Sequence, residues 1–314
     1  MRVRILNPDA DDPFAITATQ WAAATTRHKA AALSRTDGND AHILIAPPGV
    51  LARALPLAMP DLRMIFLTAS GPDRLMPFIW LPDGVLLVNN RGVHGSKVGD
   101  YVLMALLMLG NAMPHFAAAQ RAQTWAPRFT PVLRGKRVTI IGTGDLGQSA
   151  ARAAATRGMI PIGVNTRGAL VDGFDAVFAV DALDACLPTS DFLVLACPLT
   201  AATRGMINRD RLTLLPKGAG VINVGRGALL NTEALCDLLE QDHIGGAVCD
   251  VFDPEPIAAD DRLWTTRNLV ITPHVAADDP ASYNDDSLDI FFRNLAAWRA
   301  GTPLPNLIDL ARGY

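Results

Sequence analysis

The 314-residue sequence has little of what several protein classes depend on. Its four cysteines, at positions 186, 197, 236 and 249, form no CxxC pair, so we expect neither a disulfide framework nor a metal site, and a reducing cytoplasm fits. The net charge is −3, with no excess of basic residues. This balance argues against a nucleic-acid partner.

Long hydrophobic runs are also missing. The most apolar segment covers residues 101–109, far short of the roughly 20 residues that a membrane span needs. The apolar stretch at the N-terminus meets proline and acidic residues too soon for a signal peptide. We expect a soluble cytoplasmic protein that does not enter a membrane.

What the sequence does have is a series of short apolar runs separated by helical patterns. Runs that are apolar throughout are typical of parallel strands buried on both faces. In the first hundred residues, helices are expected at 14–33 and 50–59, and strands at 3–6, 42–46, 64–68 and 86–90. A second series starts at residue 137, with strands expected at 137–141, 160–164, 176–180, 192–196, 220–224, 247–251 and 269–271. The sequence therefore predicts an α/β protein with two doubly wound parallel sheets.

A long helical pattern separates the two series. It runs from Lys97 to about Gln123, and Pro114 is expected to break it. Its wide apolar face carries Val98, Val102, Ala105, Leu106 and Leu109. This face fits either a buried core or a subunit interface.

The second series opens with a glycine-rich turn. The stretch GTGDLG places Gly142, Gly144 and Gly147 around Asp145 and Leu146, between the strand RVTII and a helical pattern. In that context the glycines allow a tight turn and let backbone N–H groups approach a pyrophosphate at a helix N-terminus. The turn therefore predicts dinucleotide binding.

The residues after the next strand indicate which dinucleotide is bound. An NAD site usually has Asp or Glu there, to hold the ribose hydroxyls. This chain has Asn165, Thr166 and Arg167. No carboxylate would repel a 2′-phosphate, and Arg167 could pair with it, although it could also be an ordinary surface arginine. We expect NADP(H) to be preferred, with NAD(H) possible.

Three later segments complete a recognisable set: residues 215–235, with NVGRG inside them, CDVFDPEP at 249–256, and ITPHVAA at 271–277. Together with GTGDLG they resemble the D-isomer-specific 2-hydroxyacid dehydrogenase family. The similarity covers nearly the whole chain, and the ending NLIDLARGY is like that of the glyoxylate/hydroxypyruvate reductase branch.

The resemblance implies roles for three residues. Arg226 matches the arginine that binds and polarises a 2-oxo acid, and His274 matches the acid/base histidine. Glu255 matches the carboxylate that pairs with this histidine and favours its charged form. Each would more often be structural if it stood alone, and the three motifs together carry the assignment.

Further positions follow from the same resemblance. Ser70 and Gly71, in LTASGPD, match the loop that holds the substrate carboxylate, although Pro72 departs from the usual residue and a plain surface turn is the alternative. Arg91 and His94 fit a solvated loop better than a substrate contact, and Phe292 and Trp298 are unplaced candidates for selectivity. Residues expected to contact the cofactor by backbone or side chain are Pro198, Val224, Gly225, Asp250 and His274.

The resemblance also implies an architecture and a reaction. A flavodoxin-like substrate domain would comprise residues 1–96 and 285–314, and a Rossmann cofactor domain residues 97–284, with the active site in an interdomain cleft. The family suggests a homodimer built on the cofactor domains. The expected reaction is NADPH-dependent reduction of a small 2-oxo acid, such as glyoxylate or hydroxypyruvate, to the D-2-hydroxy acid.

Two other functions remain open. Some relatives with this fold are dinucleotide-sensing co-repressors with little turnover, and the intact triad of Arg226, Glu255 and His274 favours an enzyme without excluding that role. Formate oxidation is disfavoured, because that branch pairs its histidine with an amide side chain and position 255 is an acid here.

Overall fold

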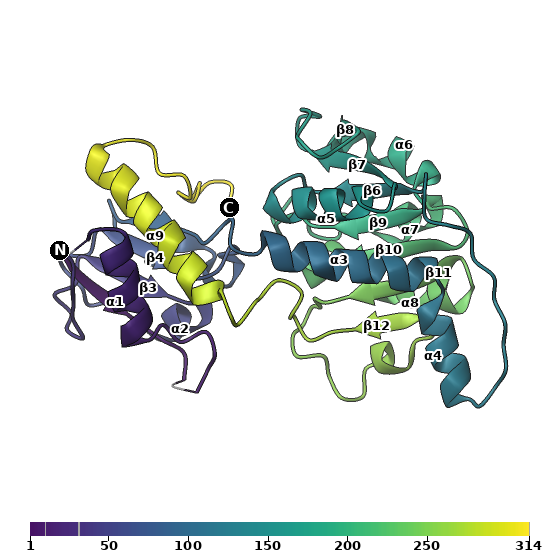
Figure 1. Ribbon diagram of the computed structural model, residues 1–314, viewed down its shortest axis with the longest axis horizontal. Helices are drawn as coiled ribbons and strands as arrows, with labels where there is room; N and C mark the ends of the chain where they lie inside the picture. The colour runs from purple at the N-terminus through teal and green to yellow at the C-terminus, as the bar shows by residue number, and fades with distance from the viewer. Residues whose placement is uncertain (10, 31, 314) are drawn as a thin grey trace. The chain divides into compact units, whose positions relative to one another are not determined.

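The computed structural model describes residues 1–9, 11–30 and 32–313. The chain forms two compact units (Figure 1): unit 1 comprises Met1–His94 and Asp278–Tyr314, and unit 2 comprises Gly95–Ala277. The chain thus passes from one unit to the other twice.

The second crossing lies before the position expected from the sequence, after residue 277 and not after 284. The intervening residues are bonded into unit 1. The Tyr283 hydroxyl donates to the carbonyl of Thr68 at 2.5 Å, and the Asn284 amide donates to the carbonyls of Pro13 and Ala15. These contacts assign the start of the last helix to unit 1.

Unit 1 contains a five-stranded parallel sheet in the order β2-β1-β3-β4-β5. This is the strand order of flavodoxin-like sheets. The strands are β1 (Arg2–Ile5), β2 (Ser34–Arg35), β3 (Ile43–Ala46), β4 (Met64–Leu67) and β5 (Leu86–Val88). The four predicted strands are all present, and β2, which is short, polar and exposed, lacks the apolar run that would have revealed it.

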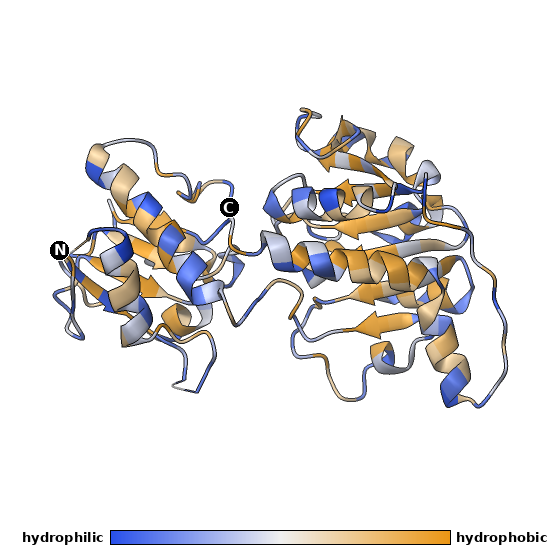
Figure 2. Cartoon of the chain, viewed as in Figure 1, coloured by the Kyte–Doolittle hydropathy of each residue, from blue (hydrophilic) through white to orange (hydrophobic). Residues whose placement is uncertain are grey.

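Alternating side chains divide this sheet between two cores, as the period of a strand requires. Ile43 and Ile45 pack in the cluster that contains residues of α1 (Ala18–Arg27) and α9 (Tyr283–Ala300), while Leu44 and Ala46 pack with α2 (Pro48–Arg53). Figure 2 shows that the strands of both units are mostly hydrophobic, whereas the helices are mixed.

The predicted helices 14–33 and 50–59 are shorter in the structure. Helix α1 begins after Thr17, whose side chain accepts from the Gln20 amide while the Gln20 side chain caps Thr17. It ends at Arg27, because Lys29 takes a left-handed conformation with φ 52°. The predictions rested on hydrophobic periodicity, which continues beyond the residues where capping ends the helix.

Unit 2 contains a seven-stranded parallel sheet in the order β12-β11-β10-β9-β6-β7-β8. The chain starts at β6 and winds outward in both directions, as in a Rossmann fold with one added strand. All seven predicted strands are present: β6 (Arg137–Ile141), β7 (Ile160–Asn165), β8 (Ala176–Ala179), β9 (Phe192–Leu195), β10 (Ala219–Asn223), β11 (Ile244–Cys249) and β12 (Leu269–Ile271).

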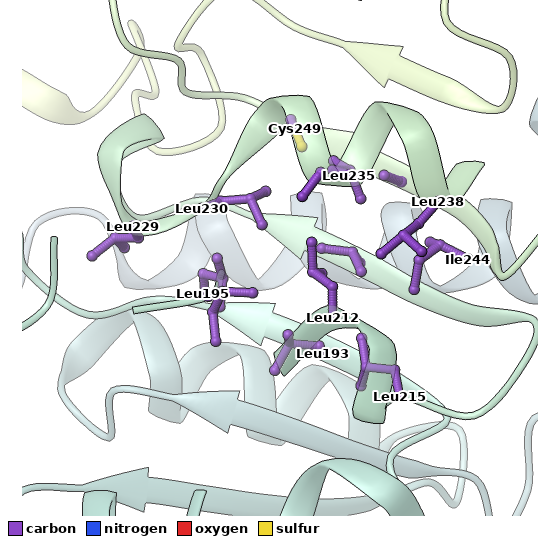
Figure 3. Close-up of a cluster of buried hydrophobic side chains, with 14 of the residues drawn as sticks. Leu193, Leu195, Leu212, Leu215, Leu229, Leu230, Leu235, Leu238, Ile244 and Cys249 are labelled. Atoms are coloured by element: carbon purple, nitrogen blue, oxygen red, sulfur yellow. The ribbon is translucent and has the colours of Figure 1, made fainter. Parts of the chain in front are cut away.

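Helices cover both faces of this sheet. On one face, α3 (Gly95–Gly110) packs against α5 (Asp145–Ala155) and the central strands. The other face carries α6 (Leu183–Cys186), α7 (Arg209–Leu214) and α8 (Thr232–Glu240). Figure 3 shows leucines from α7, α8 and β9 gathered there with Ile244 and Cys249 of β11.

The long helical pattern of residues 97–123 forms two helices, α3 and α4 (Met113–Arg121), bent by 66°. The break lies at Ala112, which has φ 52°, and not at Pro114. Pro114 lies in the first turn of α4, where a missing N–H group is tolerated. In the described part of the chain no single helix is long and apolar enough to span a membrane; this bent pair passes that test by length and composition only.

Candidate active site

The loops that follow the strands of unit 2 meet at one edge of its sheet, because all its strands are parallel. Asn223 of β10 pairs in register with Cys249 of β11, and Cys249 pairs with Ile271 of β12. The three motif loops after these strands are therefore neighbours. The glycine turn follows β6, which lies where the strand order reverses, the position at which such sheets bind ligands.

The three glycines of that turn meet different constraints. Gly142 has φ +97°, and a Cβ there would lie 2.7 Å from the carbonyl oxygen of Ala196. A Cβ on Gly147 would lie 1.8 Å from the oxygen of Gly142. Gly144 differs, because a Cβ there would meet nothing within 4 Å, and its backbone caps the N-terminus of the 11-residue helix α5. Open space at the positive end of a helix fits a pyrophosphate.

The two residues after Gly144 begin helix α5. Asp145 is its first residue and is half-buried. Leu146 packs against the core shared with α3, which gives it a structural function of its own. Their predicted contact with a cofactor stays a prediction.

The loop after β7 is organised by the side chain of Asn165. Its oxygen accepts from the backbone amides of Arg167 at 3.0 Å and Gly168 at 2.8 Å. Its nitrogen donates to the Thr143 hydroxyl at 3.0 Å and thereby ties this loop to the glycine turn. The Asn165 amide is thus directed into the protein, whereas Thr166 and Arg167 are exposed.

The turn that carries Arg226 is held from below by Asn223, which is fully buried. The Asn223 amide donates to the Arg226 carbonyl at 3.0 Å, and its oxygen accepts from the amide of Gly225 at 3.1 Å. The half-buried Arg226 guanidinium donates through Nη1 to the carbonyl of Gly225 at 2.7 Å. The arginine is therefore fixed to its own turn and reaches the sheet edge.

The next residue joins this turn to the loop of Glu255. A Cβ on Gly227 would lie 2.0 Å from the carbonyl carbon of Phe252, so the two backbones are in direct contact. The Phe252 amide donates to Glu255 Oε1 at 2.9 Å. Glu255 Oε2 lies 2.9 Å from His274 Nδ1. Arg226, Glu255 and His274 thus lie on three successive, adjoining loops.

The Glu255 contact decides how the imidazole can act. A carboxylate accepts from Nδ1–H, so Nε2 is the ring nitrogen that exchanges a proton with a ligand. The Glu255 side chain is 23% exposed and that of His274 is 40% exposed, so the histidine is reachable while its partner is largely covered. Such a pair is suited to general acid and base catalysis.

Asp250 is buried directly after β11 and organises the backbone around His274. Its carbonyl accepts from the His274 amide at 2.8 Å. Its carboxylate accepts from the amides of Val275 and Ala276, both at 2.9 Å, and from the Thr272 hydroxyl. The predicted contact of Asp250 with the nicotinamide stays a prediction beside this structural role.

The backbone positions predicted to line the cofactor follow β9 and β10. Val224 is buried, and its amide donates to the carbonyl of Leu195 at 3.1 Å. A Cβ on Gly225 would lie 3.0 Å from the carbonyl oxygen of Cys197, and the carbonyl of Pro198 accepts from the Thr203 hydroxyl at 2.8 Å.

Burial raises the pKa of the Cys197 thiol to about 12, which keeps it protonated and unsuited to be a nucleophile.

In unit 1, Ser70 and the half-buried Gly71 follow β4. The Ser70 hydroxyl donates to the carbonyl of Asn90 at 3.3 Å, and the Asn89 amide donates to the carbonyl of Ser70 at 3.0 Å. The loop is therefore anchored to the segment after β5. Its part in binding a substrate stays a prediction.

The remaining candidates of unit 1 have structural partners. Arg91 donates to the carbonyl of Pro305 at 2.6 Å, and His94 Nδ1 lies 3.3 Å from a carboxylate oxygen of Asp278. Phe292 is buried in the core, stacked on His28 with ring centroids 4.8 Å apart, and Trp298 packs against the same core.

The structure adds three residues to the site that the sequence analysis did not single out: Asn223, Thr272 and Tyr101. Asn223 and Thr272 are polar residues inside the motifs that carry Arg226 and His274, and this position was the signal in the sequence that could have identified them. Tyr101 had no signal, because it lies 171 positions before Thr272, whose hydroxyl it meets at 2.5 Å.

Comparison with known proteins gives consistent relatives. Residues 103–276 match the family described as D-isomer specific 2-hydroxyacid dehydrogenase, NAD binding domain. A glyoxylate reductase of Thermococcus kodakarensis is 31% identical over 265 residues, which cover 80% of this chain and 78% of that protein.

Two solved structures resemble the whole chain. A D-isomer specific 2-hydroxyacid dehydrogenase from Xanthobacter autotrophicus Py2, in complex with NADPH and MES, has a TM-score of 0.83 at 28% identity and covers 100% of this chain and 99% of its own. The NADPH-dependent glyoxylate/hydroxypyruvate reductase of Sinorhizobium meliloti, in complex with NADP and sulfate, has a TM-score of 0.81 at 26% identity with the same coverage.

The family match covers more than half of the chain, and it includes the glycine turn, Arg226, Glu255 and His274. The two parallel sheets agree with the same two-domain fold. The chain belongs to the D-isomer specific 2-hydroxyacid dehydrogenase family and is an NAD(P)-dependent enzyme of that family.

Proposed function

We propose that this protein reduces a small 2-oxo acid of the glyoxylate or hydroxypyruvate type to the D-2-hydroxy acid, with NADPH as the preferred reductant. The observation that carries the proposal is the His274–Glu255 pair, 2.9 Å apart, on loops that adjoin the Arg226 turn. All three residues follow strands of the sheet whose β6 carries the glycine turn.

Each side chain has one task in this reaction. Arg226 binds the substrate carboxylate and polarises the adjacent carbonyl. His274 donates a proton from Nε2 to the oxygen as it becomes a hydroxyl, and Glu255 stabilises the imidazolium before that transfer. The bound nicotinamide supplies the hydride. The backbone amides of Ser70 and Gly71 are our candidates for holding the substrate carboxylate from unit 1.

A preference for NADPH is supported by the loop after β7. Asn165 stands where an NAD site usually has an acid, and its oxygen is occupied by two backbone amides. Asn165, Thr166 and Arg167 place no carboxylate at this position, and Arg167 is exposed. The relatives from Xanthobacter and Sinorhizobium were solved with NADPH and NADP.

The cofactor preference is tested by replacing Arg167 with aspartate. The ratio of kcat/KM for NADPH to that for NADH should fall by roughly 100-fold, about 3 kcal/mol, because an ion pair with the 2′-phosphate is lost and a repulsion is added. Arg157→Asp, exposed beyond the opposite end of α5, is the control and should keep the ratio. Equal use of NADPH and NADH by the unmodified protein would contradict the preference.

We also propose that the protein is a homodimer built on unit 2. One face of α3 is buried in unit 2, as the core interpretation of this helix requires. Its other face carries the partly exposed residues Leu103, Leu107 and Met108 and the exposed Met104. Residues 101–109 of α3 are apolar throughout. A helical segment of that kind is usually covered on all sides, and a second copy of the chain would provide that cover.

The reaction itself is tested by following NADPH oxidation with a panel of 2-oxo acids, while formate is incubated with NAD⁺ and NADP⁺ in parallel. Fast oxidation with glyoxylate or hydroxypyruvate, and none with formate, supports the proposal. Tight dinucleotide binding with negligible turnover of every substrate would instead support a dinucleotide-sensing binding protein. Turnover of formate would contradict the role assigned to Glu255.

A further inference from the structure

A chain of hydroxyl groups links helix α3 to the loop of the acid/base histidine. The Tyr101 hydroxyl lies 2.5 Å from the Thr272 hydroxyl. Thr272 in turn donates to Asp250 Oδ1. All three groups lie in unit 2, and Tyr101 and Asp250 are both buried.

The direction of these hydrogen bonds follows from the groups themselves. A carboxylate only accepts, so the Thr272 hydroxyl spends its proton on Asp250. Its oxygen must therefore accept from Tyr101. Burial raises the pKa of Tyr101 to about 12, so the phenol keeps the proton that this arrangement requires.

Asp250 connects these hydroxyls to the backbone of the histidine loop. Its carboxylate accepts from the amides of Val275 and Ala276, and its carbonyl accepts from the amide of His274. His274 has φ +58°, a left-handed conformation that a residue with a side chain rarely adopts. Such a backbone persists where its surroundings determine it, and here the bonds to Asp250 on both sides do so.

We propose that Tyr101 is a positioning residue for His274, acting through Thr272 and Asp250. The hydroxyl of Tyr101 orders Thr272, which fixes one oxygen of Asp250, and Asp250 holds the backbone on which the imidazole is mounted. This proposal rests on the proposed function of His274 as the acid in 2-oxo acid reduction. It assigns to α3 a part in the reaction without contact with substrate or cofactor.

The test uses the full-length protein and four substitutions. Tyr101→Phe removes the first hydroxyl alone. Thr272→Val removes the second with little change in shape, and Thr272→Ser keeps it. Thr139→Val is the matched control, because Thr139 is also buried and its hydroxyl meets that of Ser190 at 2.5 Å, with no link to residues 272–276.

The first readout is steady-state kinetics. A misplaced proton donor slows the chemical step more than it weakens binding, so kcat should fall roughly 10-fold in Tyr101→Phe and roughly 30-fold in Thr272→Val. The KM values for NADPH and for the 2-oxo acid should stay within about twofold. Thr272→Ser should retain most of the wild-type rate. The variant that combines Tyr101→Phe with Thr272→Val should be no slower than Thr272→Val alone, because the two hydroxyls act in series.

The second readout does not depend on activity. Backbone hydrogen exchange in the segment 272–277 should become several-fold faster in Tyr101→Phe and in Thr272→Val, since the Val275 and Ala276 amides lose a fixed acceptor. Thr139→Val should leave exchange in this segment and kcat unchanged. If Tyr101→Phe does not fold, Thr272→Val and Thr272→Ser carry both readouts.

Several outcomes would overturn the proposal: a wild-type kcat in Tyr101→Phe, unchanged exchange in the segment 272–277, or equal effects of Thr139→Val. Failure of the proposed function is distinct from these. It appears as an unmodified protein that binds NADPH and reduces no 2-oxo acid, and the exchange data then decide alone whether Tyr101 holds the histidine loop.

Discussion

At the residue scale, the side chains at the sheet edge are positioned by buried partners. Both the oxygen and the nitrogen of the Asn223 side chain form hydrogen bonds within the turn of Arg226. One oxygen of Glu255 accepts from the amide of Phe252, and the other contacts His274. Leaving a buried polar group without its partner costs about 1–3 kcal/mol. Reactive side chains with such support keep one geometry.

Arg226→Ala should remove substrate recognition while it spares the cofactor. We expect kcat/KM for the 2-oxo acid to fall roughly 10²–10³-fold, because one charged donor to the substrate is lost. Fluorescence titration should show an unchanged dissociation constant for NADPH. Arg209→Ala is the control, since Arg209 pairs with Asp237 elsewhere on the surface of unit 2. Wild-type kcat/KM in Arg226→Ala would remove this role.

Glu255→Gln should slow reduction. The carboxylate lies 2.9 Å from His274 Nδ1 and orients the imidazole through a charge-assisted hydrogen bond. An amide provides a weaker and less fixed partner, so kcat should fall roughly 10-fold or more while the dissociation constant of NADPH stays within about twofold. Asp253→Asn, in the same loop and paired with Arg204, should keep kcat. A wild-type kcat in Glu255→Gln would exclude this carboxylate from the mechanism.

At the scale of elements, the glycines of the GTGDLG turn meet two different requirements, one of the fold and one of the expected ligand. Gly142 and Gly147 are needed by the fold itself, because a Cβ on either would strike backbone atoms of the same unit. Gly144 is not, since a Cβ there would point into open space. Three glycines with identical signals in the sequence therefore do different work.

Substitution by alanine separates the two requirements experimentally. Gly147→Ala should destabilise the protein by about 3 kcal/mol, because a methyl group 1.8 Å from the Gly142 oxygen forces the turn apart. Gly144→Ala should cost about 1 kcal/mol or less, the usual difference at a helix N-cap, and should instead weaken NADPH binding at least 10-fold. Denaturant unfolding and NADPH titration give the two numbers. Unchanged NADPH affinity in Gly144→Ala would contradict phosphate binding at this turn.

Helix ends show where prediction from local sequence stops. The strands were predicted correctly because each is a local apolar run. The ends of α1 and α3 are different, because each helix ends just before a residue in the left-handed conformation, Lys29 after α1 and Ala112 after α3. Neither is the glycine that usually marks such a turn. The periodic pattern continues through both positions, so only the folded chain shows the break.

At the scale of the whole molecule, exposed aromatic side chains bear on assembly. Trp125 and Phe129 follow α4 and are 96% and 97% exposed, and Val132 next to them is also exposed. Large apolar side chains exposed on one short segment are candidates for an interaction site. This segment follows α4, the helix after α3, whose exposed face we propose to be covered in a dimer.

The double variant Trp125→Ser, Phe129→Ser should be monomeric at micromolar concentration, whereas the unmodified protein should sediment as a dimer. Trp264→Ser, which removes another exposed aromatic residue of unit 2, should not change the mass. Sedimentation velocity measures all three. A monomeric unmodified protein would contradict the dimer.

The sequence by itself determined the α/β class, eleven of the twelve strands found in the described residues, and the chemistry expected at the glycine turn and at Arg226, Glu255 and His274. These features depend on apolar runs, on glycine spacing and on motifs, all of which are local. The tertiary structure decided which residues support that chemistry. Thr272 and Tyr101 entered the site through a contact between residues 171 positions apart, whereas Asn223 supports Arg226 through bonds within its own turn. A hydroxyl buried by folding gains its partner from the packing of α3 on the sheet, and no local pattern in the chain encodes that meeting.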